Sequence, residues 1–284
     1  MSRIVLRIFC LGLILLAAVA GAAAGTLTGT VRNGTTGQPA AAVPVVLLRT
    51  MAGMDAVADA KTDAQGRYHL EHAALGREPM LIRVNFKGVL FHRQLPPGTS
   101  TSEIEIDVFE PTQDAKAMQI HTRLIGLQPN GASLLVGEEY TILNSTKPPA
   151  AQYKPDGNFD FQVPERGELA EVSAWGPAGM PVMQGTIDKG PRRYAIAFAF
   201  RPGQSGVRLS YQVPYAGNQT ELRIPSPYAT ARTVILAPPT MQVSAAGFQP
   251  AGSEQGFNVY TRDTVPAGDA LAISVFGTAP PPSA

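Results

Sequence analysis

The segment Thr62–Leu70 reads Thr-Asp-Ala-Gln-Gly-Arg-Tyr-His-Leu. An Asp side chain can accept main-chain N–H bonds from residues just after it, and glycine adopts the positive φ that closes a turn. Asp63 to Gly66 therefore predict a turn. Because side chains alternate along a strand, Tyr68 and Leu70 then lie together on an inward face. The other role for Asp63, as a metal ligand, has less support, since a lone Asp in a turn usually bonds its own main chain.

Outward from this turn, short apolar or alternating runs are separated by clusters of turn-forming residues. Period-two alternation marks strands at 26–32, 80–86 and 104–109, and a continuous apolar run marks a buried strand at 43–48. Residues 51–60 contain Gly53 and would form only about three helical turns, so we interpret them as loop or edge strand. With 28 Gly and 25 Pro among 284 residues, the chain favours many turns. The pattern predicts an all-β protein.

Three groups of residues carry a family resemblance: Gly29-x-Val31-x-Asn33 with Gly37-x-Pro39, then 43–47, then 62–68. Together they resemble the carboxypeptidase regulatory-like domain, over residues 25–110. Members of that family resemble transthyretin, which implies a sandwich of seven strands, often classed as a carbohydrate-binding-like fold. The family domain is a non-catalytic appendage of its enzymes, and the zinc-binding catalytic domain has no counterpart in this sequence. The linker 49–60 is longer than the family pattern, and the later glycine-aromatic element is reduced to 87–91.

A second region begins after Pro111, because proline ends the strand before it. We predict a larger β-sandwich over 111–278, a region that resembles no family we recognise. Its clearest pattern is a hairpin of 194–200 and 207–213 around a Pro/Gly loop. Strands after about 228 either complete this sandwich or form a small third unit, and 279–284 is a proline-rich tail.

The first 24 residues have the three parts of a signal peptide. Arg3 and Arg7 precede an apolar run at 8–19, and small residues at 22–24 suit cleavage before Gly25. An uncleaved anchor is the alternative. The single cysteine, Cys10, would leave with the signal, so the mature chain would have no disulfide. We expect export in a bacterium, to the periplasm or to an extracellular or outer-membrane-associated site, with no transmembrane segment after cleavage.

Charge and motifs exclude several functions. The 23 Lys and Arg balance 22 Asp and Glu, which argues against a nucleic-acid binder. No histidine lies in a zinc-binding motif, and no nucleophile elbow, phosphate-binding loop or dinucleotide fingerprint occurs. We therefore predict no enzymatic activity, no metal and no cofactor.

Aromatic residues beside Gly or Pro are the candidate ligand-binding residues: Trp175, Tyr153, Tyr215 and Tyr228. Trp175 could stack on a sugar or an extended peptide, although a core position is the favoured interpretation of this single tryptophan. Free sheet edges could also pair with a partner strand. These features predict a non-enzymatic exported envelope protein acting in binding, adhesion or assembly, with an envelope protein or a glycan as partner. A carbohydrate-binding module is the alternative, and an enzyme with an unrecognised site is third.

Overall fold

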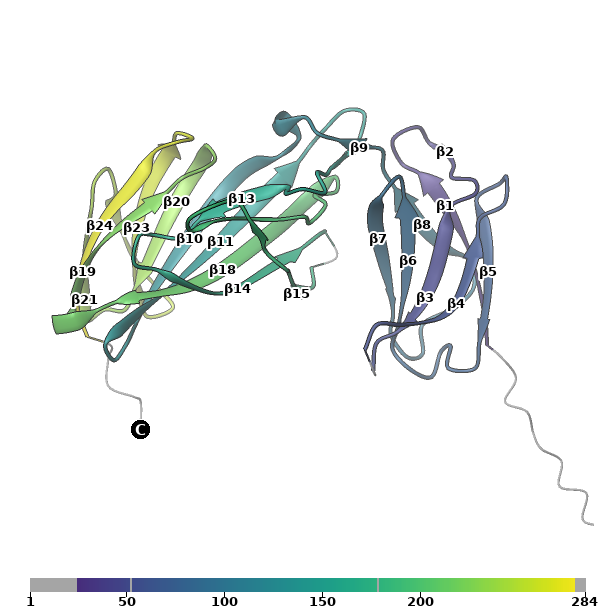
Figure 1. The fold of residues 1–284 in the computed structure, drawn as a ribbon, viewed down its shortest axis with the longest axis horizontal. Coiled ribbons are helices and arrows are strands. Elements are labelled where there is room, and N and C mark those ends of the chain that lie inside the picture. Colours follow the sequence, from purple (N-terminus) through teal and green to yellow (C-terminus); the bar gives the residue numbers. More distant parts are fainter. Residues whose placement is uncertain (1–24, 52, 178, 279–284) are drawn as a thin grey trace, which may run out of the picture.

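The computed structural model describes residues 25–278 except 52 and 178. It has two lobes side by side, with β9 (Pro111–Thr112) passing between them (Figure 1). Strands form nearly all of the regular structure, so the all-β sandwich prediction is confirmed. The predicted signal peptide, Cys10 and the tail 279–284 lie outside the described residues.

The first domain consists of two four-stranded sheets that enclose one core. In one sheet, β1 pairs with β2 and β5 along one side and with β8, in parallel, along the other. The other sheet has the antiparallel order β4-β3-β6-β7. The strands are β1 Gly25–Asn33, β2 Gln38–Pro39, β3 Pro44–Arg49, β4 Asp55–Lys61, β5 Arg67–His72, β6 Met80–Phe86, β7 Val89–Leu95 and β8 Ile104–Val108. With the two-residue strand β2, the domain has eight strands, one more than the family resemblance implies. The segment 51–60 contributes most of the edge strand β4.

The turn before β5 forms as predicted. Asp63 Oδ1 accepts from the main-chain N–H of Gln65 at 2.9 Å and of Arg67 at 2.8 Å. Gly66 has a φ of +75°. Tyr68 and Leu70 are both buried in the core of the first domain. The hydrogen bonds to Asp63, first of all from the Arg67 main chain, lower the pKa of its carboxyl group.

The second domain is built on one sheet of eight strands, in the order β15-β14-β18-β11-β10-β20-β23-β22. The long central strands alternate buried and exposed residues, so that one face enters the core. Among the described strand pairs of this sheet, β10–β20 is parallel and the others are antiparallel. The strands are β10 Gln119–Asn130, β11 Ser133–Asn144, β14 Glu168–Trp175, β15 Val182–Met183, β18 Gly203–Pro214, β20 Thr230–Ala237, β22 Gln249–Glu254 and β23 Phe257–Val265.

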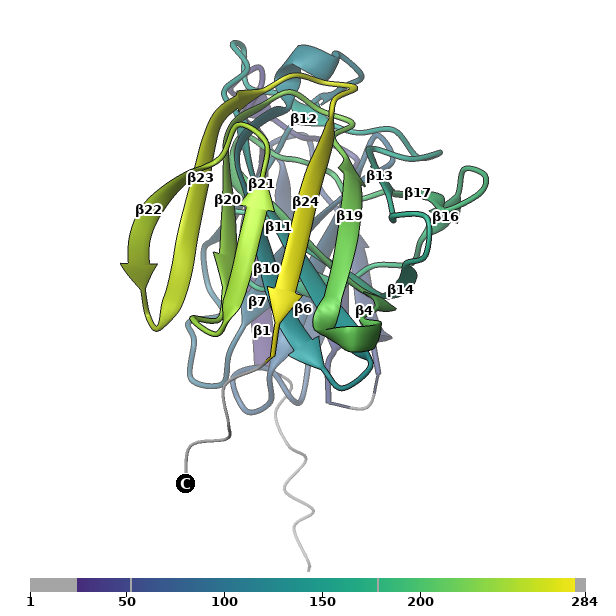
Figure 2. The ribbon, with the colours of Figure 1, turned by 90° about the vertical axis from the view of Figure 1, so that its left-hand side faces the viewer.

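Two three-stranded sheets pack on the inner face of the large sheet and share its core. Figure 2 shows one of them, β19-β24-β21, in front of β10 and β11. The other has the order β13-β17-β16. Their strands are β13 Phe159–Gln162, β16 Ile187–Asp188, β17 Arg193–Ile196, β19 Gln219–Pro225, β21 Met241–Ala245 and β24 Ala270–Gly277.

The predicted hairpin of 194–200 and 207–213 is wrong. β17 pairs with β13 and β16, whereas β18 pairs with β11 and β14 in the large sheet. The segment between them crosses from one layer of the sandwich to the other, and alternation alone does not specify a pairing partner. Strands after 228 join β10 through β20 and join β19 through β24, so they complete the second sandwich.

The joint between the domains has two strands. β9 (Pro111–Thr112) pairs in parallel with β12 (Ala151–Gln152), and a 3-10 turn, η1 (Ala115–Ala117), follows β9. Ala151 is fully buried within the first-domain core, although it follows β11 of the second domain. Thr35 also donates to the Pro149 carbonyl, and its Oγ1 accepts from the Glu110 N–H at 2.9 Å.

No helix among the described residues is long and apolar enough to cross a membrane.

Replacing Gly66 and Gly37 separates the backbone strain of a positive φ from the steric cost of a close contact. Both glycines have φ near +75°, where an L-residue costs about 1–2 kcal/mol. A Cβ on Gly66 would lie 2.5 Å from the Val31 carbonyl oxygen, whereas one on Gly37 would meet nothing within 4 Å. We expect Gly66→Ala to lower the free energy of unfolding by clearly more than Gly37→Ala, as measured by urea denaturation. Equal losses would contradict the close contact with β1.

Candidate functional site

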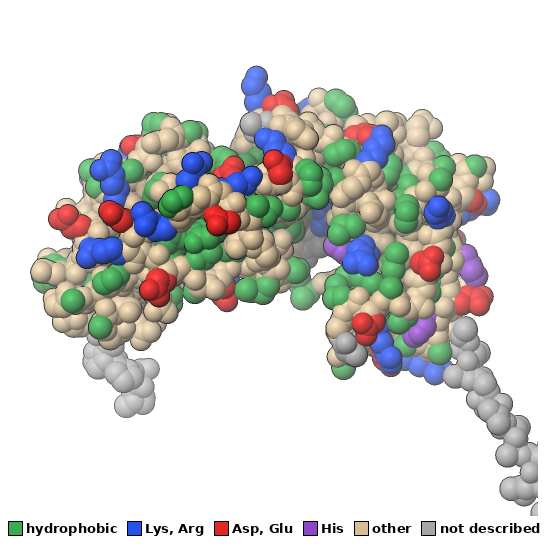
Figure 3. All heavy atoms as spheres, in the orientation of Figure 1, with side chains coloured by type: hydrophobic (Ala, Val, Ile, Leu, Met, Phe, Trp, Pro, Cys, Tyr) green, Lys and Arg blue, Asp and Glu red, His purple; other side chains and the backbone are tan. Residues whose placement is uncertain are grey.

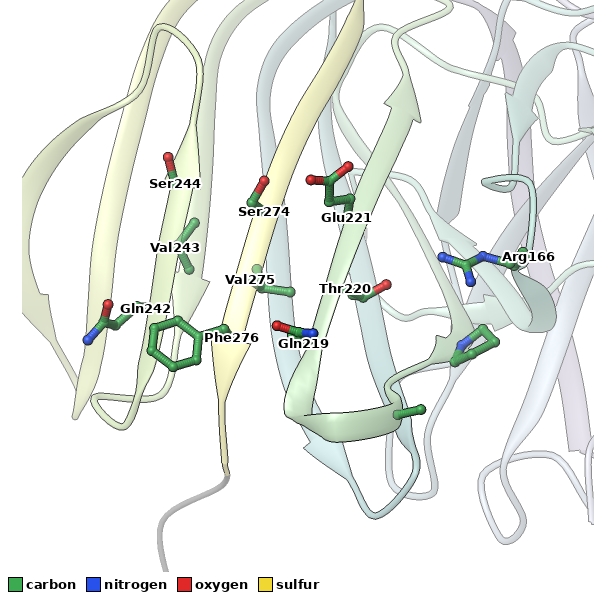
Figure 4. A pocket seen from close by; sticks show the side chains of 12 residues that line it. Arg166, Gln219, Thr220, Glu221, Gln242, Val243, Ser244, Ser274, Val275 and Phe276 are labelled. Carbon is green, nitrogen blue, oxygen red and sulfur yellow. The ribbon is translucent and has the colours of Figure 1, made fainter.

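A groove of about 640 Å³ lies over the outer face of the β19-β24-β21 sheet (Figure 4). Two rows of side chains cross all three strands in register. Gln219, Phe276 and Gln242 form one row, and Glu221, Ser274 and Ser244 form the next. Arg166, from the loop between β13 and β14, borders the groove beyond β19. The surface therefore combines amides, hydroxyls, one carboxylate and one aromatic ring.

Strand alternation explains the composition of this face. In β24, Leu271, Ile273 and Val275 are buried, which turns Ser274 and Phe276 outward. Phe276 is 52% exposed, unusual for so large an apolar side chain. The same alternation was visible in the sequence, where an aromatic residue out of phase with an apolar strand could have indicated this site. The three strands are too far apart in sequence for the rows themselves to be predicted.

β19 has a free edge beside the groove. It pairs with β24 over all seven residues without a bulge, and with no other strand among the described residues. No hydrogen bond found within the described chain joins the main chain of 220–224 to anything beyond β24. The other long edge of this domain, β22, carries Pro250 and a bulge, devices that protect edges from pairing. β19 is thus the second domain's longest regular edge in the described structure.

The charged groups of the groove are available to a ligand. Neither Glu221 nor Arg166 makes an ion pair or a side-chain hydrogen bond within the part of the chain that the structure describes. Arg223, two residues after Glu221 and also exposed, is likewise without such a partner there. Outward side chains along β19 thus alternate in charge, with a carboxylate followed by a guanidinium.

Two of the sequence-predicted aromatic residues lie away from the groove. Trp175 is on the outer face of the large sheet, where its indole covers Gly206 and leaves no room for a Cβ. The Arg208 guanidinium lies 5.6 Å from the indole ring centroid. Tyr153 packs against the first-domain core beside the joint. These contacts give Trp175 and Tyr153 a packing role.

The other two aromatic residues are turned inward. Tyr215 lies between the groove residues Pro214 and Ala216, but its ring is only 1% exposed and its hydroxyl donates to the Gly277 carbonyl at 2.9 Å. Tyr228 stacks on Phe159 and borders a second, mainly apolar groove of about 560 Å³. Burial raises the pKa of both hydroxyl groups. The four aromatics therefore do not form a common surface, and their role in ligand binding stays a prediction.

A cluster of ionisable groups lies inside the second core. Arg123 and Glu138 are 2% and 1% exposed, and Glu138 Oε2 accepts from Arg123 Nη2 at 2.6 Å and from the Tyr140 hydroxyl at 2.6 Å. Glu138 Oε1 accepts from Tyr211 at 2.9 Å, and Arg123 Nη1 donates to Ser226 Oγ at 2.8 Å. Desolvation raises the pKa of both tyrosines. For Arg123, desolvation is the largest single influence and lowers the pKa, but the charge and hydrogen bond of Glu138 together with the two tyrosines outweigh it, so the pKa is raised.

This cluster has hydrogen-bond partners within the protein and is closed to solvent. Each Glu138 oxygen accepts at least one hydrogen bond from the protein, and Arg123 also donates to the Pro225 carbonyl at 3.1 Å. A substrate in solvent would have no access to these groups. We assign the cluster a structural role.

No three His, Cys, Asp or Glu side chains come together as metal ligands in residues 25–278 as described. His69 Nε2 lies 3.1 Å from Glu71 Oε1, and His72 Nδ1 accepts from the Ala74 N–H. The predicted absence of metal, cofactor and catalysis stays a prediction.

Comparison with known proteins gives solved structures only. No protein-family model and no curated protein matches the chain. An M1 zinc metallopeptidase from Deinococcus radiodurans matches with 12% identity and a TM-score of 0.34 over 57% of this chain and 42% of the enzyme. A variant of it bound to a Tyr-Ser-Ala substrate matches with 13% identity and a TM-score of 0.34, over 57% and 43%. A candidate protease from Parabacteroides distasonis matches with 12% identity and a TM-score of 0.32, over 57% and 40%. The chain spans less than half the length of these proteins.

These matches correct the predicted function. The proteins are peptidases by name, which contradicts the prediction of a non-enzymatic exported envelope protein for binding, adhesion or assembly, together with its carbohydrate-binding alternative. We withdraw that prediction. At these TM-scores the likeness carries no argument for a peptidase activity in this chain either.

A double-mutant cycle tests the buried ion pair. Arg123→Met leaves a carboxylate buried without its cation, and we expect a loss of about 3–5 kcal/mol in the free energy of unfolding. Adding Glu138→Leu removes the unpaired charge, so the double variant should recover a large part of that loss. Urea denaturation measures all the variants.

The exposed Arg208–Glu139 pair, also formed between strands of the large sheet, is the matched control. Its disruption should cost about 0–1 kcal/mol. Additive losses at Arg123 and Glu138 would contradict the coupling.

Proposed function

We propose that the groove along β19 binds an extended polypeptide, which adds to the sheet as a further strand beyond β19. The free edge of β19 carries this proposal, because its main chain offers unpaired donors and acceptors to an incoming strand. Polypeptide main chain is the chemistry that such an edge recognises. The partner is thus a protein segment in extended conformation.

The flanking side chains support a preference among sequences. A strand added beside β19 would place outward side chains next to Glu221 and Arg223, with Arg166 on its far side. Opposite charges paired across strands contribute about 0.2–1 kcal/mol each. A basic residue beside Glu221 and an acidic residue beside Arg223 and Arg166 are therefore favoured. The amides of Gln219 and Gln242 add donors and acceptors on the outer side.

The experiment selects peptides from a library against the purified chain and measures the best one by titration calorimetry. The same peptide is then made with N-methyl groups on either set of alternate residues. Strand addition uses only one set of N–H groups, so one methylated form should lose binding and the other should keep it. Glu221→Lys should weaken binding by about 3–10-fold, following the loss of one favourable cross-strand pair and the gain of a repulsive one.

Arg232→Glu is the matched control, because Arg232 is exposed on β20 of the large sheet, away from the groove. Its affinity for the peptide should not change. Equal tolerance of both methylation patterns would overturn the proposal. Saturable binding of a glycan at the groove, without any peptide binding, would overturn it as well.

We also propose that residues 25–110 are a carboxypeptidase regulatory-like domain. The two four-stranded sheets and the Asp63 turn support this assignment.

Export is a further proposal, and it rests on the order of basic, apolar and small residues in the first 24 positions. Expression in a bacterium, fractionation and N-terminal sequencing check it. We expect the mature chain to begin at Gly25 in the periplasmic or extracellular fraction. An intact Met1 in the cytoplasm would contradict it.

A further inference from the structure

The outer side of β6 and β7 faces the second domain. Arg83 and His92 are register partners on these two strands and point to that side. Gln94, two residues beyond His92 and on the same side, donates from Nε2 to Met180 Sδ of the second domain at 3.0 Å. Figure 3 shows a histidine side chain next to the gap between the two lobes, with a Lys or Arg side chain close by.

Arg201, from the second domain, lies against the loop between β14 and β15, and Met180 in the same loop accepts the hydrogen bond from Gln94. Arg201 lies two residues before β18, and its guanidinium lies over Gly176, where a Cβ would come within 2.6 Å of Nη2. Its side chain is half-buried, which makes an unanswered guanidinium costly. Arg83 is half-buried too.

These three side chains have no acceptor in the described part of the chain. None of the hydrogen bonds or ion pairs found there involves the side chain of Arg83, His92 or Arg201. A guanidinium carries five N–H donors, and buried donors are normally paired. The arrangement therefore leaves positive charge and donors together with no counter-charge.

The pKa shifts of these groups are consistent with their lying close together. His92 is exposed by area, yet its pKa is lowered to about 4, first by desolvation and then by the positive charges of Arg201 and Arg83. Desolvation also lowers the pKa of Arg201. The positive charge of Arg93, the next residue on β7, influences the pKa of Tyr68 and is not among the charges that shift the pKa of His92. The charged groups facing His92 are thus both cationic.

We propose that Arg83, His92 and Arg201 bind a small oxyanion, such as a phosphate, sulfate or carboxylate group, between the two domains. Two guanidinium groups can each donate to such an anion in the forked geometry that suits its oxygens. The anion supplies the missing acceptors and the missing negative charge. This site is separate from the β19 groove and does not rest on the peptide proposal.

Sulfate is the first probe, because its charge is constant between pH 5 and pH 7. Titration calorimetry of the purified chain should show saturable sulfate binding that strengthens as the pH falls from 7 to 5, since binding favours protonation of His92. His92→Gln should remove this pH dependence. Arg201→Gln should weaken binding by about 10-fold or more, following the loss of a charged hydrogen-bonding partner. Phosphate and acetate titrations then identify which oxyanion binds best.

Thermal melting without added anion separates a binding role from a structural one. Removing Arg201 relieves repulsion among like charges, so Arg201→Gln should melt at the same temperature as the parent chain or higher at low salt. The control Arg232→Gln should leave sulfate affinity unchanged. A lowered melting temperature for Arg201→Gln, absence of saturable binding by all three anions, or an equal effect of Arg232→Gln would overturn the proposal.

Discussion

Burying Arg123 and Glu138 between two sheets is unfavourable by several kcal/mol per ion unless each keeps its partners. Those partners come from β10, β11, β18 and the segment after β19. A one-residue slip of any of these strands would turn a charged group outward or leave one unpaired. The network thus fixes the register of the central strands and the position at which the outer sheet joins them. The apolar core contributes most of the stability, and the ion pair determines one alignment of the strands around that core.

The groove depends on that arrangement. The end of β19 is held by hydrogen bonds from Arg123 to Pro225 and Ser226, so the strand that presents the free edge is anchored at one end to the central ion pair. Its neighbour β24 gives the core Leu271, Ile273 and Val275 and gives the groove Ser274 and Phe276. One alternating strand therefore serves both the stability of the sandwich and the chemistry of its surface.

Local chemistry explains what the sequence could predict. The Asp63 turn, the inward Tyr68 and Leu70, and the all-β character follow from side-chain hydrogen bonding and alternation over a few residues. The pairing of strands across the sandwich does not follow from local alternation. The sequence pattern therefore predicts one hairpin for 194–200 and 207–213, which the structure does not contain. The groove joins residues from 166 to 276, and the positive charge of Arg201 influences the pKa of His92 from another domain. The topology of the fold brings such distant residues together, and this produces no periodic pattern in the sequence. The four aromatic residues beside Gly and Pro lie at separate places, since turns at different points of the chain close over different parts of the two cores.

The two-strand joint affects how the lobes can move. A single connecting strand allows rotation about two bonds per residue, so the lobes would swivel freely. Here β9 and β12 run side by side, and Ala151 is embedded in the neighbouring core. Twisting one lobe against the other must shear this pairing and pull a methyl group out of its packing. The joint therefore resists torsion, which keeps the relative orientation of the domain faces that carry His92 and Arg201.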